Sequence, residues 1–300
     1  MKRFEEICKM SQRELKTYLT KYVKNKYNDV TSSDGFIYAK GTFPVLLVAH
    51  MDTVHKENVK YIVYEEGGNK ISSPQGIGGD DRAGIYMIMQ IIKDYNCSVL
   101  FTEDEEIGCI GANKFVKAIR KKEIEIAKVN YMIELDRKGN KDAVFYECDN
   151  PEFESFILQD NDWEYANGSY TDIVEIEPEI GVAGVNFSCG YYNAHTTDEY
   201  VIISEMRENI SKVKKLLART NVDEEFEYIE VESGYYGYGY GYGGYYDYEL
   251  KTYYIAAQTK NGKYIEEEFY AMSEAEAIGL FMENYPEICY NDLVDVFCEE

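Results

Sequence analysis

A short apolar segment that ends in a histidine constrains the fold more than any other feature of this sequence. It runs from Pro44 to Ala49 and is followed by His50, with Asp52 two residues further on. An uninterrupted apolar run of this kind is typical of a strand buried on both faces of a parallel sheet. A strand ending in His-x-Asp can present an imidazole to a metal ion, because the Asp can hold the other ring nitrogen. Alone, the pattern more often marks a hydrogen-bonded polar residue than a ligand, so the later segments decide.

Three further apolar runs are each followed by acidic residues or a histidine. These are Cys97–Thr102 before Glu105 and Glu106, Val129–Leu135 before Asp136, and Gly181–Cys189 before His195. Helical spacing predicts helices at Ser11 to about Lys26 (with a capping box to Glu14), Ile85–Lys93, Ala112–Lys121, Glu152–Asp160 and Ile203–Leu217. The alternation predicts an α/β fold, a three-layer α/β/α sandwich with a mixed, mostly parallel central sheet. Such folds place their sites at the carboxyl ends of the strands.

Shorter segments complete a predicted first domain over residues 1–220. They are the strands Phe36–Lys40 and Ala143–Cys148, and a hairpin of Asn58–Glu66 and Lys70–Ser73 that turns at Gly67 and Gly68. Residues 221–248 are acidic and then almost entirely Gly and Tyr, which is typical of a linker. A sticky aromatic segment for a protein partner is the alternative interpretation of this acidic, Tyr-rich stretch.

Residues 249–300 predict a small β-β-α-β module without a catalytic constellation. Its expected elements are the strands Lys251–Thr259 and Lys263–Tyr270 joined by a turn at Lys260–Gly262, a helix that starts at the capping box Ser273–Glu276 and runs to about Asn284, and the strand Ile288–Phe297. The role of this module is not evident from its residues.

Charge and cysteine content exclude several classes of partner. The last 80 residues hold 19 acidic and 3 basic residues, which is −16 of the total net charge of −24. An acidic surface disfavours nucleic acid and anionic membranes as partners. No apolar run approaches the ~18 residues of a membrane span, and no secretory signal is visible. The seven scattered cysteines form no Cys-x-x-Cys pair, so a cytoplasmic location is expected.

A glycine-rich loop carries two adjacent carboxylates. Gly76–Gly84 includes Asp80 and Asp81 and leads into a predicted helix. The alternatives are a phosphate loop and a plain helix cap. The Gly-Lys-Ser/Thr of a Walker loop is absent, and two carboxylates would repel an anion. The loop therefore suits a cation better.

Seven polar residues thus follow apolar strands or this loop: His50, Asp52, Asp80, Glu105, Glu106, Asp136 and His195. Histidine and carboxylate ligands without cysteine favour a hydrolytic zinc, manganese or cobalt centre over a structural zinc site. The carboxylates outnumber the histidines, which points to two metal ions that share a bridging aspartate.

These motifs resemble those of the co-catalytic di-zinc exopeptidases, a superfamily that includes peptidase T, the glutamate carboxypeptidases, the aminoacylases and the di-zinc aminopeptidases. The resemblance covers roughly residues 36–217. It implies two divalent ions, with Zn²⁺ preferred and Co²⁺ or Mn²⁺ as alternatives. The implied roles are Asp80 as the bridge, His50 and Asp136 at one ion, Glu106 and His195 at the other, Glu105 as general base, and Asp52 as the residue that orients His50. Of Asp80 and Asp81, the motif selects Asp80 as the bridge.

Elementary chemistry agrees with these implied roles. Glu105 and Glu106 are adjacent, so in an extended conformation their side chains point in different directions, and one can bind metal while the other takes a proton from water. Tyr191, Tyr192 or Asn193 could donate a hydrogen bond to the oxyanion, judged only from their position before His195.

One spacing departs from the peptidase T pattern. Many such members insert a lid or dimerisation domain of about a hundred residues between the fourth and fifth ligands, whereas Asp136 and His195 are 59 residues apart. The chain therefore resembles a lidless exopeptidase that removes a terminal residue from a small peptide. The alternatives are an amidohydrolase of N-acyl amino acids or cell-wall peptides, and an inactive peptidase-like binding protein.

Overall fold

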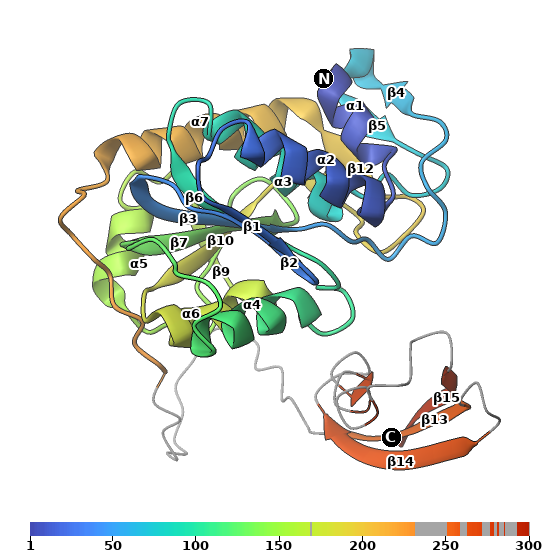
Figure 1. The fold of residues 1–300 in the computed structure, drawn as a ribbon. Coiled ribbons are helices and arrows are strands. Elements are labelled where there is room, and N and C mark those ends of the chain that lie inside the picture. Colours follow the sequence, from blue (N-terminus) through green and yellow to red (C-terminus); the bar gives the residue numbers. More distant parts are fainter. Residues whose placement is uncertain are drawn as a thin grey trace, which may run out of the picture. The chain divides into compact units, whose positions relative to one another are not determined.

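The computed structural model of the chain (Figure 1) describes residues 1–168, 170–231, 251–258, 263–271, 277, 278, 281, 285 and 293–299. The chain divides into two compact units. The first comprises Met1–Glu105 and Cys109–Val231, and the second comprises Glu106–Gly108 and Glu232–Glu300.

An eight-stranded mixed sheet forms the middle layer of the first unit. Its order is β1 (Val30–Ser33), β2 (Phe36–Ala39), β6 (Cys97–Thr102), β3 (Phe43–His50), β7 (Tyr131–Arg137), β10 (Gly184–Ser188), β8 (Asp142–Val144) and β9 (Glu164–Ala166). The four central strands, β6, β3, β7 and β10, are mutually parallel, while β2 and β8 run antiparallel to them. The three-layer sandwich with a mostly parallel sheet is thus confirmed.

Alternate side chains of β3 explain why an uninterrupted apolar run is needed there. Val45, Leu47 and Ala49 belong to one buried cluster, and Leu46 and Val48 belong to another on the opposite face. Both faces are covered by helices, as Figure 1 shows. The helices α1 (Lys2–Cys8), α2 (Gln12–Lys24), α3 (Gly79–Ile91), α5 (Pro151–Leu158) and α7 (Ile203–Arg219) contribute to the first cluster, and α4 (Ile110–Arg120) and α6 (Asp172–Ile180) to the second.

A second, four-stranded sheet holds the loops near the predicted site. Its order is β11 (Tyr191–Tyr192), β12 (Tyr200–Ile202), β5 (Lys70–Ser72) and β4 (Val63–Glu65), with the short 3-10 helix η1 (Glu66–Gly68) between β4 and β5. The predicted hairpin therefore exists, but its first strand is shorter than expected. Because β12 pairs with β5, the segment after His195 is tied to a segment far earlier in the chain.

Some predicted elements differ from the structure. The helix from Ser11 has its capping box and ends at Lys24. Strand β8 stops at Val144 rather than Cys148, because the chain adopts a positive φ at Tyr146. Helix α6 was not expected, since Pro178 and four acidic residues interrupt its apolar pattern. The elements α1, β1 and β9 and the pair β11 and β12 were also not predicted.

Residues 221–231 belong to the first unit rather than to a linker. Phe226 is buried and stacks on Phe156, with ring centroids 5.0 Å apart. The Phe226 carbonyl accepts the Ala183 N–H at 2.8 Å, and its own N–H donates to the Asn130 carbonyl at 2.9 Å. The first unit accordingly runs to Val231.

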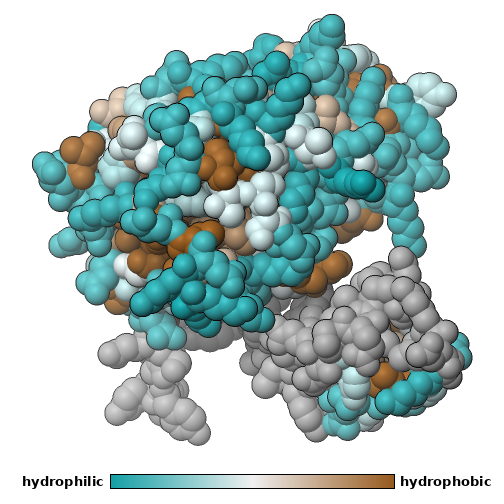
Figure 2. All heavy atoms as spheres, viewed as in Figure 1, coloured by the Kyte–Doolittle hydropathy of each residue, from teal (hydrophilic) through white to brown (hydrophobic). Residues whose placement is uncertain are grey.

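In the second unit, β13 (Lys251–Gln258) lies between β14 (Tyr264–Ala271) and β15 (Leu293–Glu299), and both pairs are antiparallel. The expected turn at 260–262, the capping box at 273–276 and the Gly/Tyr stretch at 234–248 lie outside the described residues. Among the described helices, none has the length and apolar character that crossing a membrane requires. The face drawn in Figure 2 is largely hydrophilic, with apolar residues scattered over it.

Candidate metal centre

The carboxyl ends of the central parallel strands bring the predicted residues to one edge of the sheet. His50 is the last residue of β3 and pairs with Thr102, the last residue of β6. Asp136 lies near the end of β7, the neighbour of β3 on its other side. Asp80 and Asp81 stand in the first turn of α3, where their backbone is not helical and the peptide bond between them is cis.

The first ligand group consists of His50, Asp80 and Asp136, which can each direct one ligand atom to a common point, with these atoms within 4.8 Å of one another. His50 Nε2 lies 3.0 Å from Asp80 Oδ1 and 3.4 Å from Asp136 Oδ1. His50 is only 1% exposed. This group joins the ends of two buried strands to the glycine-rich loop.

The second ligand group consists of Asp80, Glu106 and His195, again within 4.8 Å. His195 Nε2 lies 3.3 Å from Asp80 Oδ2, and its side chain is 57% exposed. The two oxygens of Asp80 therefore face two different imidazoles, one in each group. This is the arrangement expected of a carboxylate that bridges two cations.

Asp81 belongs to neither ligand group. Its Oδ2 accepts the His50 N–H at 3.3 Å, and its Oδ1 accepts the Gly84 N–H at 2.9 Å. A side chain at Gly84 would meet the Leu135 carbonyl at 1.7 Å, so only glycine allows this approach of α3 to β7. Asp81 thus holds the backbone of His50, while Asp80 faces the site.

Asp52 and three other residues support the first ligand group. Asp52 Oδ1 lies 3.2 Å from His50 Nδ1 and also accepts the Glu105 N–H at 3.1 Å. Asp136 Oδ1 accepts from the Tyr191 hydroxyl at 3.2 Å, Asp136 Oδ2 from Thr171 at 3.4 Å, and the Asp136 N–H donates to Asn186 at 2.9 Å. Hydrogen bonds of this kind orient metal ligands.

The electrostatics of the site fit a bound cation. Burial, together with the negative charge of Asp80, raises the pKa of Asp136 to about 7. Burial alone would also raise the pKa of Asp80, but hydrogen bonds with His195 and His50 hold it below its usual range. Carboxylates crowded in a buried place repel one another, and a divalent cation between them would remove that repulsion. Two imidazoles and three carboxylates without a thiolate are a donor set suited to catalytic zinc, cobalt or manganese.

The three residues expected to donate to an oxyanion have other partners. The Tyr191 hydroxyl donates to Asp136, and Tyr191 is buried. The Tyr192 hydroxyl donates to Glu205 at 2.6 Å, and its ring stacks on Tyr200. The Asn193 amide donates to the Asp198 carbonyl at 3.4 Å. Tyr191 is therefore better described as a support for Asp136.

Sequence reasoning missed two residues beside the site, Glu199 and His55. Glu199 is fully buried and accepts hydrogen bonds from the backbone of the glycine-rich loop, and His55 Nε2 lies 2.7 Å from its carboxylate. The available signals were the position of Glu199 four residues after His195 and the fact that His55 is the remaining histidine of the chain.

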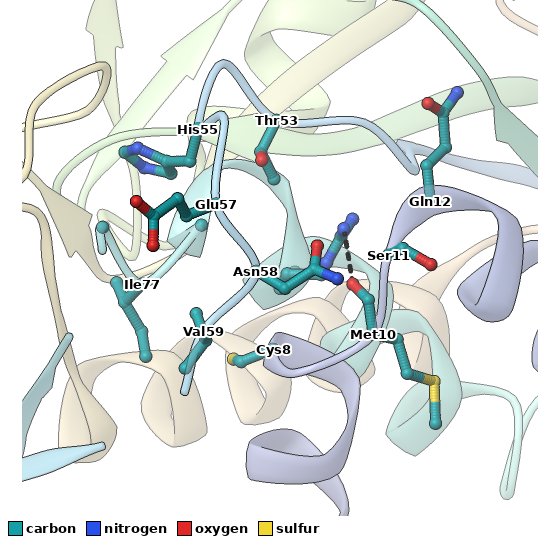
Figure 3. Close-up of a pocket in the computed structure, with 13 residues that line it drawn as sticks. Cys8, Met10, Ser11, Gln12, Thr53, His55, Glu57, Asn58, Val59 and Ile77 are labelled. Atoms are coloured by element: carbon teal, nitrogen blue, oxygen red, sulfur yellow. Dashed lines mark hydrogen bonds between the residues drawn. The ribbon is translucent and has the colours of Figure 1, made fainter. Parts of the chain in front are cut away.

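A cavity of about 150 Å³ lies beside the glycine-rich loop and the loop that carries His55. Its lining includes Thr53, His55, Gly76 and the buried Arg82. Figure 3 shows Thr53 and His55 on one loop of its wall, with Met10 across from them. Arg82 donates to the carbonyls of Met51 and Met10, so it ties the segment after His50 to the connection between α1 and α2.

Comparisons with known proteins agree with the predicted superfamily. The sequence profile of peptidase family M28 matches residues 37–168, a range that contains every proposed ligand except His195. No curated protein matches the sequence.

The fold is similar to those of solved peptidases. Aminopeptidase PepT from Bacillus cereus ATCC 10987 is 14% identical with a TM-score of 0.58, covering 72% of this chain and 96% of that chain. A tripeptidase from Staphylococcus aureus subsp. aureus Mu50 is 14% identical with a TM-score of 0.55, covering 72% and 97%. An aminopeptidase from the archaeon Desulfurococcus kamchatkensis is 13% identical with a TM-score of 0.56, covering 74% and 95%. At these identities the likeness shows the fold alone.

Proposed function

We propose that this chain, which matches the profile of peptidase family M28 and has the fold of solved exopeptidases, is a metal-dependent exopeptidase that removes a terminal residue from short peptides. One observation carries the proposal. The Asp80 carboxylate directs one oxygen to His50 and the other to His195, with a further carboxylate beside each imidazole. A protein without a metal has no evident use for this costly concentration of acids.

The first ligand group would hold one divalent ion and the second would hold another, with Asp80 common to both. Zinc is the proposed metal, because it accepts both imidazole and carboxylate ligands. When bound, such a pair of ions acidifies a water molecule and polarises the carbonyl of the scissile amide.

Glu105 is the proposed general base. It would take a proton from the attacking water and return it to the leaving amine nitrogen. Its backbone is fixed relative to the first ligand group, because the Glu105 N–H and the His50 imidazole share Asp52 Oδ1. The same contact favours the His50 tautomer with hydrogen on Nδ1, which leaves the Nε2 lone pair directed to the site.

Metal content and substrate profile together test this function. The purified full chain is analysed for transition metals and then incubated with a mixed library of short peptides, N-acyl amino acids and cell-wall peptides, and the products are identified by mass spectrometry. We expect two ions per chain and the release of single terminal residues from short peptides.

Other results separate the alternatives. Cleavage of N-acyl amino acids or cell-wall peptides alone would replace the proposal with an amidohydrolase. A folded protein that binds metal but turns over no member of the library would indicate a binding protein. A folded protein that takes up no transition metal would refute the metal centre itself.

A further inference from the structure

We propose that Glu199 is a positioning residue that holds the loop of Asp80 against the loop of His195, and thereby controls binding of the ion in the second ligand group. The inference rests on the proposed metal centre. It concerns a residue that is not itself in either ligand group.

The Glu199 carboxylate is buried, and both of its oxygens accept hydrogen bonds from the glycine-rich loop. Its exposed fraction is 0%. Oε2 accepts the Gly78 N–H at 2.8 Å, and Oε1 accepts the Asp80 N–H at 2.9 Å. The second of these bonds fixes the backbone of the residue that carries the bridging carboxylate.

His55 completes the surroundings of this carboxylate. Its Nε2 lies 2.7 Å from Glu199 Oε2. Its ring lies directly on Gly76, where a Cβ would come within 2.1 Å of the imidazole. At Gly79, a Cβ would stand 3.2 Å from Glu199 Oε1 and 2.7 Å from the Tyr191 Cβ. The two glycines thus leave space for Glu199 and His55 to press against the loop.

The second ligand group depends on Glu199 more than the first does. His50 and Asp136 stand on buried strands, with supports of their own in Asp52 and Tyr191. His195 instead lies in an exposed loop with a positive φ of 65°. Glu199 is in that same loop, where its N–H donates to the Thr196 carbonyl at 3.2 Å. Its side chain joins this loop to the backbone of Asp80.

A carboxylate is required at this position because all three neighbours are donors. Gly78 and Asp80 present backbone N–H groups, and His55 presents its ring nitrogen. Glutamine has the same shape, but its NH₂ group would face one of these donors, and a buried mismatch of this kind is costly. The loop would then shift, and the spacing between Asp80 and His195 would change.

Zinc titration tests the inference. Metal-stripped full-length protein is titrated with Zn²⁺ in competition with a chromophoric chelator, for the wild type and for Glu199→Gln. We expect two ions in the wild type. In the variant, the ion of the first ligand group should bind as in the wild type. The ion of the second ligand group should bind about 10- to 100-fold more weakly, which is the usual loss when a residue that supports a ligand is changed. Glu205→Gln, which changes a carboxylate bonded to Tyr192, is the matched control and should leave both affinities unchanged.

Two results would overturn the inference: unchanged binding of both ions, or an equal loss at both. If Glu199→Gln does not fold, His55→Ala decides. It removes one of the three donors and should weaken only the second ion, by about 2- to 10-fold, the equivalent of one hydrogen bond. Unchanged zinc binding in His55→Ala would then refute the inference. A wild type that binds no zinc would refute the proposed function and this inference with it, whereas two ions that bind every variant with wild-type affinity would refute the inference alone.

Discussion

The two ligand groups of the candidate metal centre are built in different ways. In the first, His50 and Asp136 stand at the ends of adjacent parallel strands, and His50 is 1% exposed. In the second, the His195 side chain is 57% exposed and lies in a loop. Asp80 belongs to both groups.

This difference separates two ways of positioning a ligand. A strand in the centre of a sheet is fixed by its ladder of hydrogen bonds and by packing on both faces, so a residue at its end is positioned by the fold itself. A loop residue needs specific hydrogen bonds to distant segments, and Glu199 supplies them here. The positions of His50 and Asp136 should therefore tolerate changes in the loops, and the position of His195 should not.

The largest expected effect on activity comes from a substitution that removes the proposed base and leaves both ligand groups intact. Glu105→Gln should lower kcat on a short peptide by about 100- to 10,000-fold, the contribution usual for general base catalysis. Its zinc content should stay at the wild-type value. Glu123→Gln, an exposed acid outside the site, is the control. Wild-type turnover by Glu105→Gln would show that another group takes the proton.

The counterpart of the Glu199 experiment is a change in the support of the first ligand group. Asp52→Asn should lower the zinc affinity of the first ligand group by about 10- to 100-fold and leave that of the second nearly unchanged. The amide cannot favour the Nδ1–H tautomer of His50 as a carboxylate does. Competition titration with Zn²⁺ measures both affinities. If Asp52→Asn and Glu199→Gln weaken the same ion, the two groups are not supported independently.

Asp172, a buried acid at the start of α6, leads to a prediction about the pH dependence of stability. Burial raises the pKa of Asp172 to about 6, although the Thr102 hydroxyl at the end of β6 donates to it. The ordinary value is about 3.9, so between about pH 4 and pH 6 the folded protein keeps a proton that the unfolded chain releases. Stability of the metal-free protein conferred by this group therefore falls as pH rises through that interval.

Asp172→Asn should remove this dependence. The variant should gain more in Tm over the wild type at pH 8 than at pH 4, measured by calorimetry in the presence of a chelator. An equal shift in Tm at the two pH values would mean that Asp172 has an ordinary pKa in the folded protein.

The smallest effect is expected from residues 232–300. Deletion of residues 232–300 should change kcat/KM on a short peptide by less than about twofold, because every proposed ligand and the proposed base lie earlier in the chain. Deletion of residues 221–300 should in addition lower Tm, because it removes the buried Phe226, whose truncation alone would cost about 3–5 kcal/mol. A loss of activity in the shorter deletion would mean that residues 232–300 help to shape the centre.

The sequence by itself determined the layered fold and the set of candidate ligands. Apolar runs such as Pro44–Ala49 specify buried parallel strands, because both faces of such a strand must be apolar. The residues that end these runs then meet at one edge of the sheet, so His50 and Asp136 were expected near one another, and the resemblance to the di-zinc exopeptidases implied that they share one ion. The start of the helix at Ser11 was predictable because its capping box is complete within four consecutive residues.

Only the tertiary structure decided how the loops work. It showed that Asp81 accepts backbone N–H groups, while Asp80, which the motif had already selected, faces both imidazoles. It also brought Glu199 to Gly78, 121 residues away along the chain. Such hydrogen bonds have no periodic pattern in the sequence, because they depend on where two loops meet after the strands have paired.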